Sequence, residues 1–163
     1  MKYRQNKDCI FCKIVSGEIS TPGIFWESDT HLAMLSINPN TEGFTVVIPK
    51  DHYDSDIMLM DDEPLQALIL AAKEVAGILV DAFGDVGRVG VMMEGLGVNH
   101  AHVKLFPMHN TKELKGGKWK SFDTDKEFWF DEFEGWMSSG PGPLANDEDL
   151  KRLAQKIKDS YQK

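Results

Sequence analysis

Short segments in which apolar and polar residues alternate predict a sheet. Side chains in a strand point to opposite faces in turn, so this alternation is typical of strands with one buried face. The Ser28-Asp29 turn separates two such segments, and a dense cluster of turn residues from Asn38 to Gly43 precedes a third. We predict strands at residues 24–28, 31–37, 44–48 and 88–93.

A broad apolar stripe with helical spacing predicts one long helix. Acidic residues and a proline at positions 61–64 are typical of a helix N-terminus, and Gly84 is typical of a helix end. The stripe consists of Leu65, Leu68, Ile69, Ala72, Val75, Ala76, Leu79, Val80 and Phe83. The pattern predicts an α+β fold with an antiparallel sheet of about five strands and one long helix packed on it, followed by a C-terminal extension and helix.

The segment His-Ala-His-Val-Lys-Leu-Phe-Pro-Met-His, at residues 100–109, predicts the fifth strand. Pro107 ends it, because proline cannot donate to a ladder. Alternation places His100, His102 and Lys104 on one face and Ala101, Val103 and Leu105 on the other. The first face would then hold the reactive side chains, and the second face would pack in the hydrophobic core. The alternative is that the two histidines lie on a solvent face without a function.

The residues after position 110 differ in composition from those before them, which predicts a second part of the chain. Lysines surround Gly116-Gly117, an acidic and aromatic segment runs from Phe122 to Trp136, and a linker precedes a final helix that begins near Asn146. We predict a domain at residues 1–110 and a C-terminal extension at residues 111–163 that packs on the domain or on a dimer partner. The aromatic residues are expected to pack, with base stacking as the alternative.

Charge and length exclude several classes of function. The 163 residues include 18 basic and 26 acidic side chains, and the net charge of -8 disfavours nucleic-acid binding. A local cationic site for a small phosphate ligand is still allowed. The N-terminus is polar, and no apolar run reaches the length of a membrane span. We therefore expect a cytoplasmic protein with neither a membrane nor a nucleic acid as partner.

Cys9 and Cys12 are the only cysteines. A Cys-x-x-Cys pair without a secretion signal suggests metal binding or redox chemistry rather than a structural disulfide. No βαβ unit surrounds the pair, which favours half of a zinc site over a redox motif. Two more ligands would come from the histidines at positions 31, 52, 100, 102 and 109. The alternative is a pair of partly buried thiols without metal.

The histidine segment resembles the signature of the histidine triad (HIT) superfamily. That pattern is His-φ-His-φ-His-φ-φ, with φ apolar, and Lys104 stands where the third histidine is normally found. Residues 9–18, Cys-Ile-Phe-Cys-Lys-Ile-Val-Ser-Gly-Glu, resemble the start of many bacterial and archaeal members. Residues 38–52 resemble their central hairpin. Together these stretches cover roughly the first two thirds of the chain.

The resemblance implies a HIT-like fold, a homodimer and an activity. The chain would be a nucleotide hydrolase or nucleotidyl transferase that forms a nucleotidyl-histidine at His102, with a dinucleoside polyphosphate or a nucleoside phosphoramidate as substrate. By resemblance, structural zinc would be bound by Cys9, Cys12, His52 and His100. Nucleotide binding is expected at Ser36, Asn38, Asn99 and Lys104, where Ser36 replaces a usual acidic residue that holds the ribose. Asn99 either bonds a phosphate or fixes the turn.

The lysine changes the expected chemistry. Its ordinary pKa of about 10.4, against about 6.5 for histidine, keeps Lys104 protonated at neutral pH. Phosphate affinity is then retained more surely than proton transfer, so we expect slow turnover of phosphoramidates and better turnover of dinucleoside polyphosphates. Two alternatives are a nucleotide-binding protein with weak catalysis and a zinc-stabilised interaction protein. His109 is expected in a loop and His31 at a strand end on the surface.

Overall fold

The computed structural model describes residues 3–121 and 131. The chain forms two compact units, one at residues 1–119 and a second at residues 120–163. All described helices and strands lie in the first unit. The predicted aromatic segment and final helix fall almost entirely outside the described residues.

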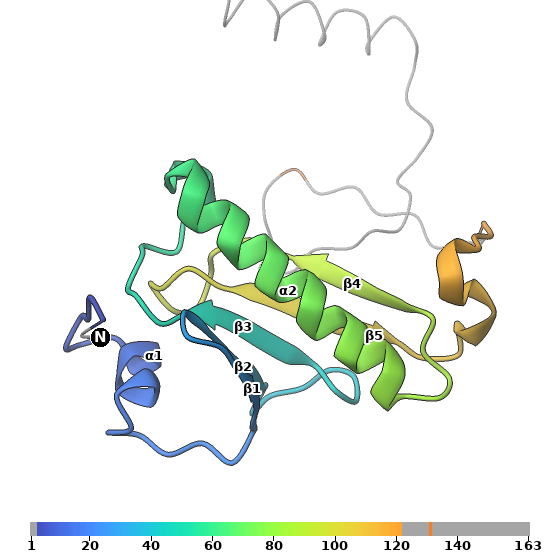
Figure 1. The fold of residues 1–163 in the computed structure, drawn as a ribbon, viewed down its shortest axis with the longest axis horizontal. Coiled ribbons are helices and arrows are strands. Elements are labelled where there is room, and N and C mark those ends of the chain that lie inside the picture. The colour runs from blue at the N-terminus through green and yellow to red at the C-terminus, as the bar shows by residue number, and fades with distance from the viewer. Residues whose placement is uncertain (1–2, 122–130, 132–163) are drawn as a thin grey trace, which may run out of the picture. The chain divides into compact units, whose positions relative to one another are not determined.

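The first unit is built on a five-stranded antiparallel sheet in the order β1-β2-β3-β5-β4 (Figure 1). The strands are β1 (Ile24–Glu27), β2 (His31–Leu35), β3 (Thr45–Pro49), β4 (Arg88–Met92) and β5 (Val103–Met108). The first three form consecutive antiparallel pairs, and β5 then pairs with both β3 and β4. The predicted strand count and the antiparallel arrangement are confirmed.

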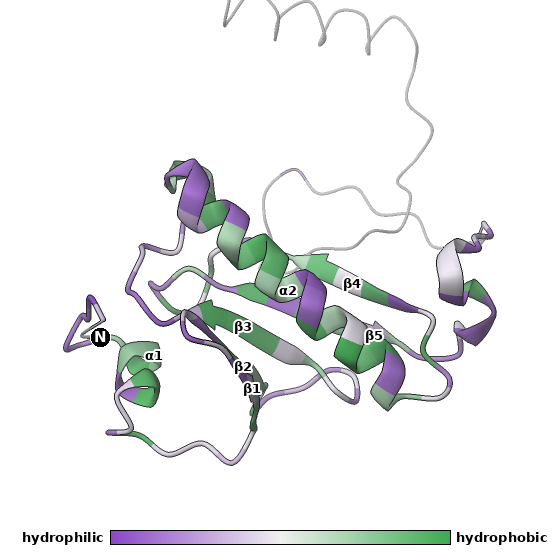
Figure 2. Cartoon of the chain, in the orientation of Figure 1, coloured by the Kyte–Doolittle hydropathy of each residue, from purple (hydrophilic) through white to green (hydrophobic). Residues whose placement is uncertain are grey.

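Helix α2 (Asp62–Ala82) lies across one face of this sheet and encloses the main core. Most of the predicted apolar stripe faces the strands, and Leu68 and Val75 are fully buried against Val47, Val103 and Leu105, whereas Ile69 is 45% exposed. Figure 2 shows hydrophobic residues concentrated along α2, β3 and β5. The predicted long covering helix is thus confirmed, although it ends at Ala82 without a left-handed glycine at position 84.

Strand β5 differs from its predicted bounds at both ends. It begins at Val103, so His100 and His102 lie just before the strand rather than in it. It continues through Pro107, which pairs with Val89, to Met108. Pairing with β3 reaches only Leu105, so the missing N–H of Pro107 lies beyond that ladder. The prediction that this proline ends the strand was therefore wrong.

A short helix, α1 (Ile10–Val15), packs on the other face of the sheet and was not predicted. Its residues Phe11, Ile14 and Val15 contact a second cluster, which consists of Leu32, Met34, Val46 and Ile48. The alternation of β2 and β3 thus buries side chains on both faces. With six residues, α1 is too short to show a helical period.

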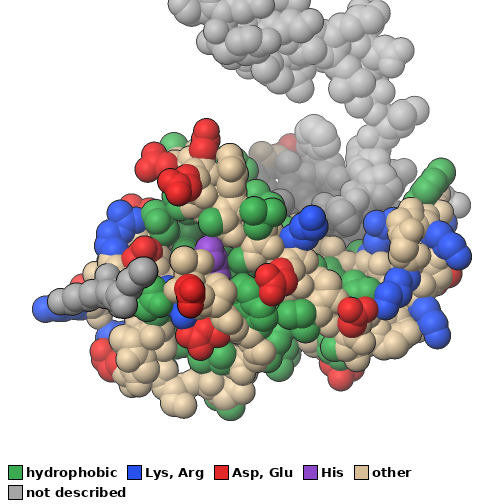
Figure 3. Space-filling model, viewed as in Figure 1, with side chains coloured by type: hydrophobic (Ala, Val, Ile, Leu, Met, Phe, Trp, Pro, Cys, Tyr) green, Lys and Arg blue, Asp and Glu red, His purple; other side chains and the backbone are tan. Residues whose placement is uncertain are grey.

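Charge is unevenly placed on the described surface. Figure 3 shows Lys and Arg side chains gathered at the right over η2 (Lys112–Gly117), and acidic side chains gathered over the start of α2. None of the described helices is both long enough and apolar enough to cross a membrane.

Candidate functional site

The two cysteines lie at the N-terminus of α1, one helical turn apart. Lys13 N donates to Cys9 O over 3.1 Å, which starts the helix and brings both thiols to one side. Cys9 and Cys12 are 7% and 2% exposed. Burial raises the pKa of the Cys12 thiol, while a 3.3 Å hydrogen bond from Asn6 N to its sulfur opposes that shift.

His52 lies in the loop after β3, and the N-terminal segment holds this loop in place. His52 N donates to Arg4 O over 2.7 Å, and Arg4 Nε donates to His52 O over 2.8 Å. The ring directs Nδ1 at the Cys12 sulfur, 3.3 Å away, and Nε2 toward an Asp54 oxygen at 3.7 Å. The loop therefore presents the imidazole to α1 from a fixed backbone.

His100 completes the group from the segment before β5. Its Nε2 donates to Pro49 O over 2.9 Å, so Nδ1 keeps its lone pair and faces the sulfurs of Cys9 and Cys12 at 3.4 and 3.6 Å. Burial lowers the pKa of this fully buried imidazole to about 4. The ring is thus neutral at neutral pH, as a metal ligand must be.

Together, Cys9, Cys12, His52 and His100 form a group that could hold a metal ion, with their donor atoms all within 4.8 Å of one another. Zn–S and Zn–N bonds of about 2.3 and 2.0–2.1 Å at tetrahedral angles separate N and S by roughly 3.6 Å. The three N···S distances of 3.3, 3.4 and 3.6 Å are close to that value. The donor set and its geometry both fit zinc, and all four predicted ligands come together.

His102 lies next to this group, with only 2% of its surface exposed. Its Nδ1 donates to the backbone oxygen of His100 over 2.7 Å. Within residues 3–121 this is the one hydrogen bond of the ring, so Nε2 keeps its lone pair. Phe11 of α1 packs its ring edgewise against both imidazoles, at centroid distances of 5.7 and 5.9 Å. The arrangement fixes the tautomer that a nucleophilic Nε2 requires.

Lys104 forms an ion pair with Glu94, a residue that the sequence did not single out. Their side chains are 24% and 13% exposed, so the pair is largely shielded from water. Burial alone would raise the pKa of Glu94, but the hydrogen bond and charge of Lys104 lower it. The predicted face with His100, His102 and Lys104 therefore also carries a carboxylate. No sequence pattern identified Glu94 as the partner of Lys104.

Ser36 and Asn38 lie at the opposite end of the strands from His102. Asn38 N donates to Ser36 Oγ over 3.2 Å, and Ser36 N donates to Phe44 O over 2.8 Å. Phe44 stacks on Phe106, which is four positions beyond His102, or about 13 Å along a strand. The structure thus places these two predicted nucleotide-binding residues apart from His102, at a distance that an extended ligand would have to span.

Asn99 connects two loops beside the metal-binding group. Its amide nitrogen donates to Asp54 over 3.0 Å, and its amide oxygen accepts from Ser55 N over 2.9 Å. Gly95 lies in the same loop as Asn99 and has a φ of 69°. A Cβ at this position would lie 2.5 Å from Ser55 O. These contacts account for Asn99 and Gly95 as residues that pack the 94–99 loop against the loop after β3.

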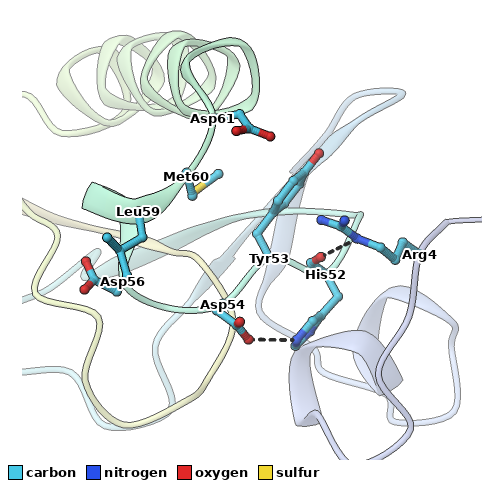
Figure 4. A pocket seen from close by; sticks show the side chains of 8 residues that line it. All are labelled: Arg4, His52, Tyr53, Asp54, Asp56, Leu59, Met60 and Asp61. Carbon is cyan, nitrogen blue, oxygen red and sulfur yellow. Dashed lines mark hydrogen bonds and ion pairs between the residues drawn. The ribbon is translucent and has the colours of Figure 1, made fainter.

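A cavity of about 450 Å³ adjoins His52 rather than His102 (Figure 4). Three aspartates, at positions 54, 56 and 61, are among the residues that line it, and Asp54 is directed at His52. Its one arginine, Arg4, lies over the Tyr53 ring at 4.4 Å. A cavity with this excess of carboxylates repels phosphate, so we do not assign it to a nucleotide.

The other two histidines lie outside the metal-binding group. His31 begins β2 and is 5% exposed, so the prediction of a surface position was wrong. It faces inward because β2 is a central strand that is covered on both faces. His109 lies in the turn after β5, as predicted, and bonds Asp85 and Glu42 O.

Comparisons with known proteins agree with this architecture. Residues 18–111 match the model of the HIT domain. An uncharacterized HIT-like protein of Methanocaldococcus jannaschii is 36% identical over 124 residues, covering 72% of this chain and 94% of its own. An adenosine 5'-monophosphoramidase of Schizosaccharomyces pombe is 31% identical, covering 73% of this chain and 88% of its own.

Solved structures show the same fold. A HIT family member from Bacillus subtilis has a TM-score of 0.61 at 26% identity, covering 94% of this chain and 96% of its own. A zinc-bound histidine triad family protein from Mycobacterium smegmatis has a TM-score of 0.54 at 27% identity, covering 67% of this chain and 81% of its own. With the domain match and the archaeal relative, these similarities establish that the chain belongs to the HIT family.

Proposed function

We propose that this protein hydrolyses or transfers a nucleotidyl group at a nucleotide phosphate, through a covalent intermediate on His102. The observation that carries the proposal is the 2.7 Å hydrogen bond from His102 Nδ1 to His100 O. A carbonyl oxygen only accepts, so the proton is on Nδ1 and the lone pair is on Nε2. An imidazole held in this way is a competent nucleophile.

The reaction has two displacement steps at phosphorus. In the first, Nε2 of His102 forms a bond to phosphorus, and the bond from phosphorus to the leaving group breaks with its electron pair on that group, which takes up a proton from solvent when it is an amine. In the second, water or another acceptor attacks phosphorus and gives its proton to solvent, and the bond to Nε2 breaks and returns the electron pair to the ring. Lys104 supplies a fixed positive charge near the phosphoryl oxygens, where negative charge develops.

The relatives support this class of reaction. The Schizosaccharomyces pombe relative is an adenosine 5'-monophosphoramidase. We propose a nucleoside phosphoramidate or a dinucleoside polyphosphate as the substrate. The nucleotide would extend from His102 and Lys104 toward Ser36 and Asn38, and Asn99 would hold the neighbouring loop or a phosphate.

We also propose that the two cysteines with His52 and His100 bind structural zinc. The N···S distances fit a tetrahedral site, and a family member from Mycobacterium smegmatis is zinc-bound. Bound zinc would fix His100, whose carbonyl in turn orients His102. The metal would thus act on structure and not on the phosphate.

A homodimer is proposed from one of the two edges of the sheet. Strand β4 forms this edge in the strand order, and its residue Val91 is 58% exposed. An exposed apolar edge strand favours pairing with a second chain. Sedimentation equilibrium of the wild-type protein and of a Val91→Lys variant tests this: a dimer that the variant weakens is expected, and a monomeric wild-type protein would overturn it.

The experiment that tests the reaction is intact mass spectrometry after brief incubation with a diadenosine polyphosphate. The quench is an alkaline denaturant, because a phosphorus–nitrogen bond to imidazole is acid-labile. We expect an added nucleotidyl mass on the wild-type protein and on His109→Ala, and none on His102→Ala. An adduct on His102→Ala, or turnover without any adduct on the wild-type protein, would contradict the covalent mechanism.

The second candidate function is nucleotide binding with little catalysis, or a zinc-stabilised interaction role. The Lys104–Glu94 ion pair favours weak catalysis, because a paired lysine stabilises less of the negative charge that develops on the phosphoryl oxygens. Calorimetry that shows nucleotide binding without release of product would identify a binding protein. No nucleotide affinity, with a partner-binding defect on deleting residues 122–163, would identify the interaction protein.

A further inference from the structure

Glu94 shares a sheet face with the proposed nucleophile. Met92 pairs with Lys104 at the end of the ladder, two residues before Glu94 and two after His102, and the Glu94 side chain bonds Lys104 and interacts with His102. The preceding residue, Met93, packs against the main core under α2. Glu94 therefore points to the opposite face, where His102 and Lys104 also lie.

One oxygen of the Glu94 carboxylate has a hydrogen-bond partner among the described residues and the other has none. Oε1 bonds Lys104 Nζ, whereas Oε2 is buried and has no hydrogen-bond partner among the described residues. Because Lys104 lowers the pKa of the carboxyl group, it is ionised at neutral pH. A buried, charged acceptor without a donor is unfavourable, so Oε2 is suited to receive an N–H or O–H group from a ligand.

The ion pair also removes the net positive charge from this face. His102 is neutral when its Nε2 is a nucleophile, and the charges of Lys104 and Glu94 cancel. A polyphosphate leaving group would bring several negative charges next to an ionised carboxylate. An amine leaving group would instead bring an N–H donor and no negative charge.

We propose that Glu94 is a specificity-determining residue that selects against highly anionic leaving groups and in favour of leaving groups with an N–H donor. The proposal rests on the proposed reaction at His102 and names which of its two substrate classes the site prefers. The sequence led us to expect better turnover of dinucleoside polyphosphates, because it treated Lys104 as an unpaired cation. In the structure Lys104 is paired with Glu94, and we therefore expect the opposite preference.

The test compares kcat/KM for diadenosine tetraphosphate and for adenosine 5'-phosphoramidate in the wild-type protein, Glu94→Gln and Glu94→Asp. We expect the wild-type protein to prefer the phosphoramidate. Glu94→Gln should raise kcat/KM for the tetraphosphate roughly tenfold and lower it for the phosphoramidate. Glu94→Asp keeps the charge and should retain the wild-type preference. A gain of activity cannot result from misfolding.

The matched control is Glu27→Gln. Glu27 also pairs with a buried lysine, Lys50, at 2.6 Å, but it lies on β1. This variant removes the same charge and the same kind of ion pair, and its substrate ratio should equal that of the wild-type protein. An unchanged ratio in Glu94→Gln, or an equal change in Glu27→Gln, would overturn the proposal.

A binding measurement with inorganic tripolyphosphate distinguishes failure of the proposed reaction from failure of the proposal for Glu94. If neither substrate turns over, the proposed function fails, and calorimetry still tests Glu94. A roughly tenfold tighter Kd for tripolyphosphate in Glu94→Gln, absent in Glu27→Gln, supports charge selection by Glu94. An unchanged Kd in Glu94→Gln would overturn it.

Discussion

The carbonyl oxygen of His100 accepts a 2.7 Å hydrogen bond from Nδ1 of His102, while Nδ1 of His100 faces two cysteine sulfurs. One residue thus takes part in the metal-binding group through its side chain and orients the proposed nucleophile through its backbone. Order in the metal-binding group is therefore linked to the tautomer and position of His102.

Loss of a cysteine ligand should destabilise the protein and reduce turnover. Cys12→Ser is expected to reduce bound zinc to background, lower Tm by ~10 °C or more and lower kcat. Elemental analysis and thermal unfolding measure these effects. Ser16→Ala, directly after the same helix, is the control and should keep both zinc and Tm. Full zinc occupancy in Cys12→Ser would contradict the assigned ligand set.

Replacement of His102 should remove turnover through chemistry rather than through folding. His102→Gly is expected to lower kcat/KM by about 10³-fold or more, because the variant lacks the nucleophile. Added imidazole should restore part of the rate by occupying the space that the side chain leaves. Steady-state kinetics with and without imidazole measure this. No rescue in a folded, zinc-containing variant would weaken the assignment of His102 as nucleophile.

The His109–Asp85 pair predicts a pH-dependent contribution to stability. A hydrogen bond to Glu42 O and the Asp85 carboxylate raise the pKa of His109, and a hydrogen bond from Asn110 N together with His109 lowers the pKa of Asp85. The histidine contribution is fully present below about pH 6.5 and is lost as pH rises through the raised pKa. The aspartate contribution is present above about pH 3.9 and is lost as pH falls through the lowered pKa.

Asp85→Asn should therefore lower Tm most near pH 5–6 and least above pH 8. Thermal unfolding across this range measures the difference from the wild-type protein. Asp81→Asn is the matched control, since Asp81 is an exposed aspartate paired with a lysine, Lys115, rather than with a histidine. A Tm difference for Asp85→Asn that does not change with pH would show that the ion pair does not contribute.

Packing of α2 on the sheet should dominate the stability of the first unit. Leu68 is fully buried, and Leu68→Ala is expected to lower the free energy of unfolding by about 2–5 kcal/mol, because it leaves a cavity. Leu70, on the same helix, is 63% exposed, so Leu70→Ala should have little effect. Urea unfolding of both variants tests this prediction. Equal effects would contradict the observed face of the helix.

Local patterns in the sequence predicted the five strands and the long helix of the fold, but not α1. The apolar stripe from Leu65 to Phe83 predicted α2, because a helix of 21 residues shows its period many times. The alternation of Ala101, Val103 and Leu105 predicted which side chains enter the core, and all three are fully buried. The Cys-x-x-Cys pair, without a surrounding βαβ unit, predicted half of a metal-binding group, and the two thiols do lie together with His52 and His100.

Contacts between distant segments were decided only by the tertiary structure. Glu94 and Lys104 became partners through the register of β4 and β5, and no local pattern encodes a register. His31 is buried on the face of β2 that also carries Ala33, so its burial depends on how α2 packs on the sheet. Cys9 meets His100, which is 91 positions away, because the sheet brings the segment before β5 next to α1. The local periodicity of a sequence predicts on which face of a strand or helix a side chain lies. Only the packing of distant segments determines which residues contact that face.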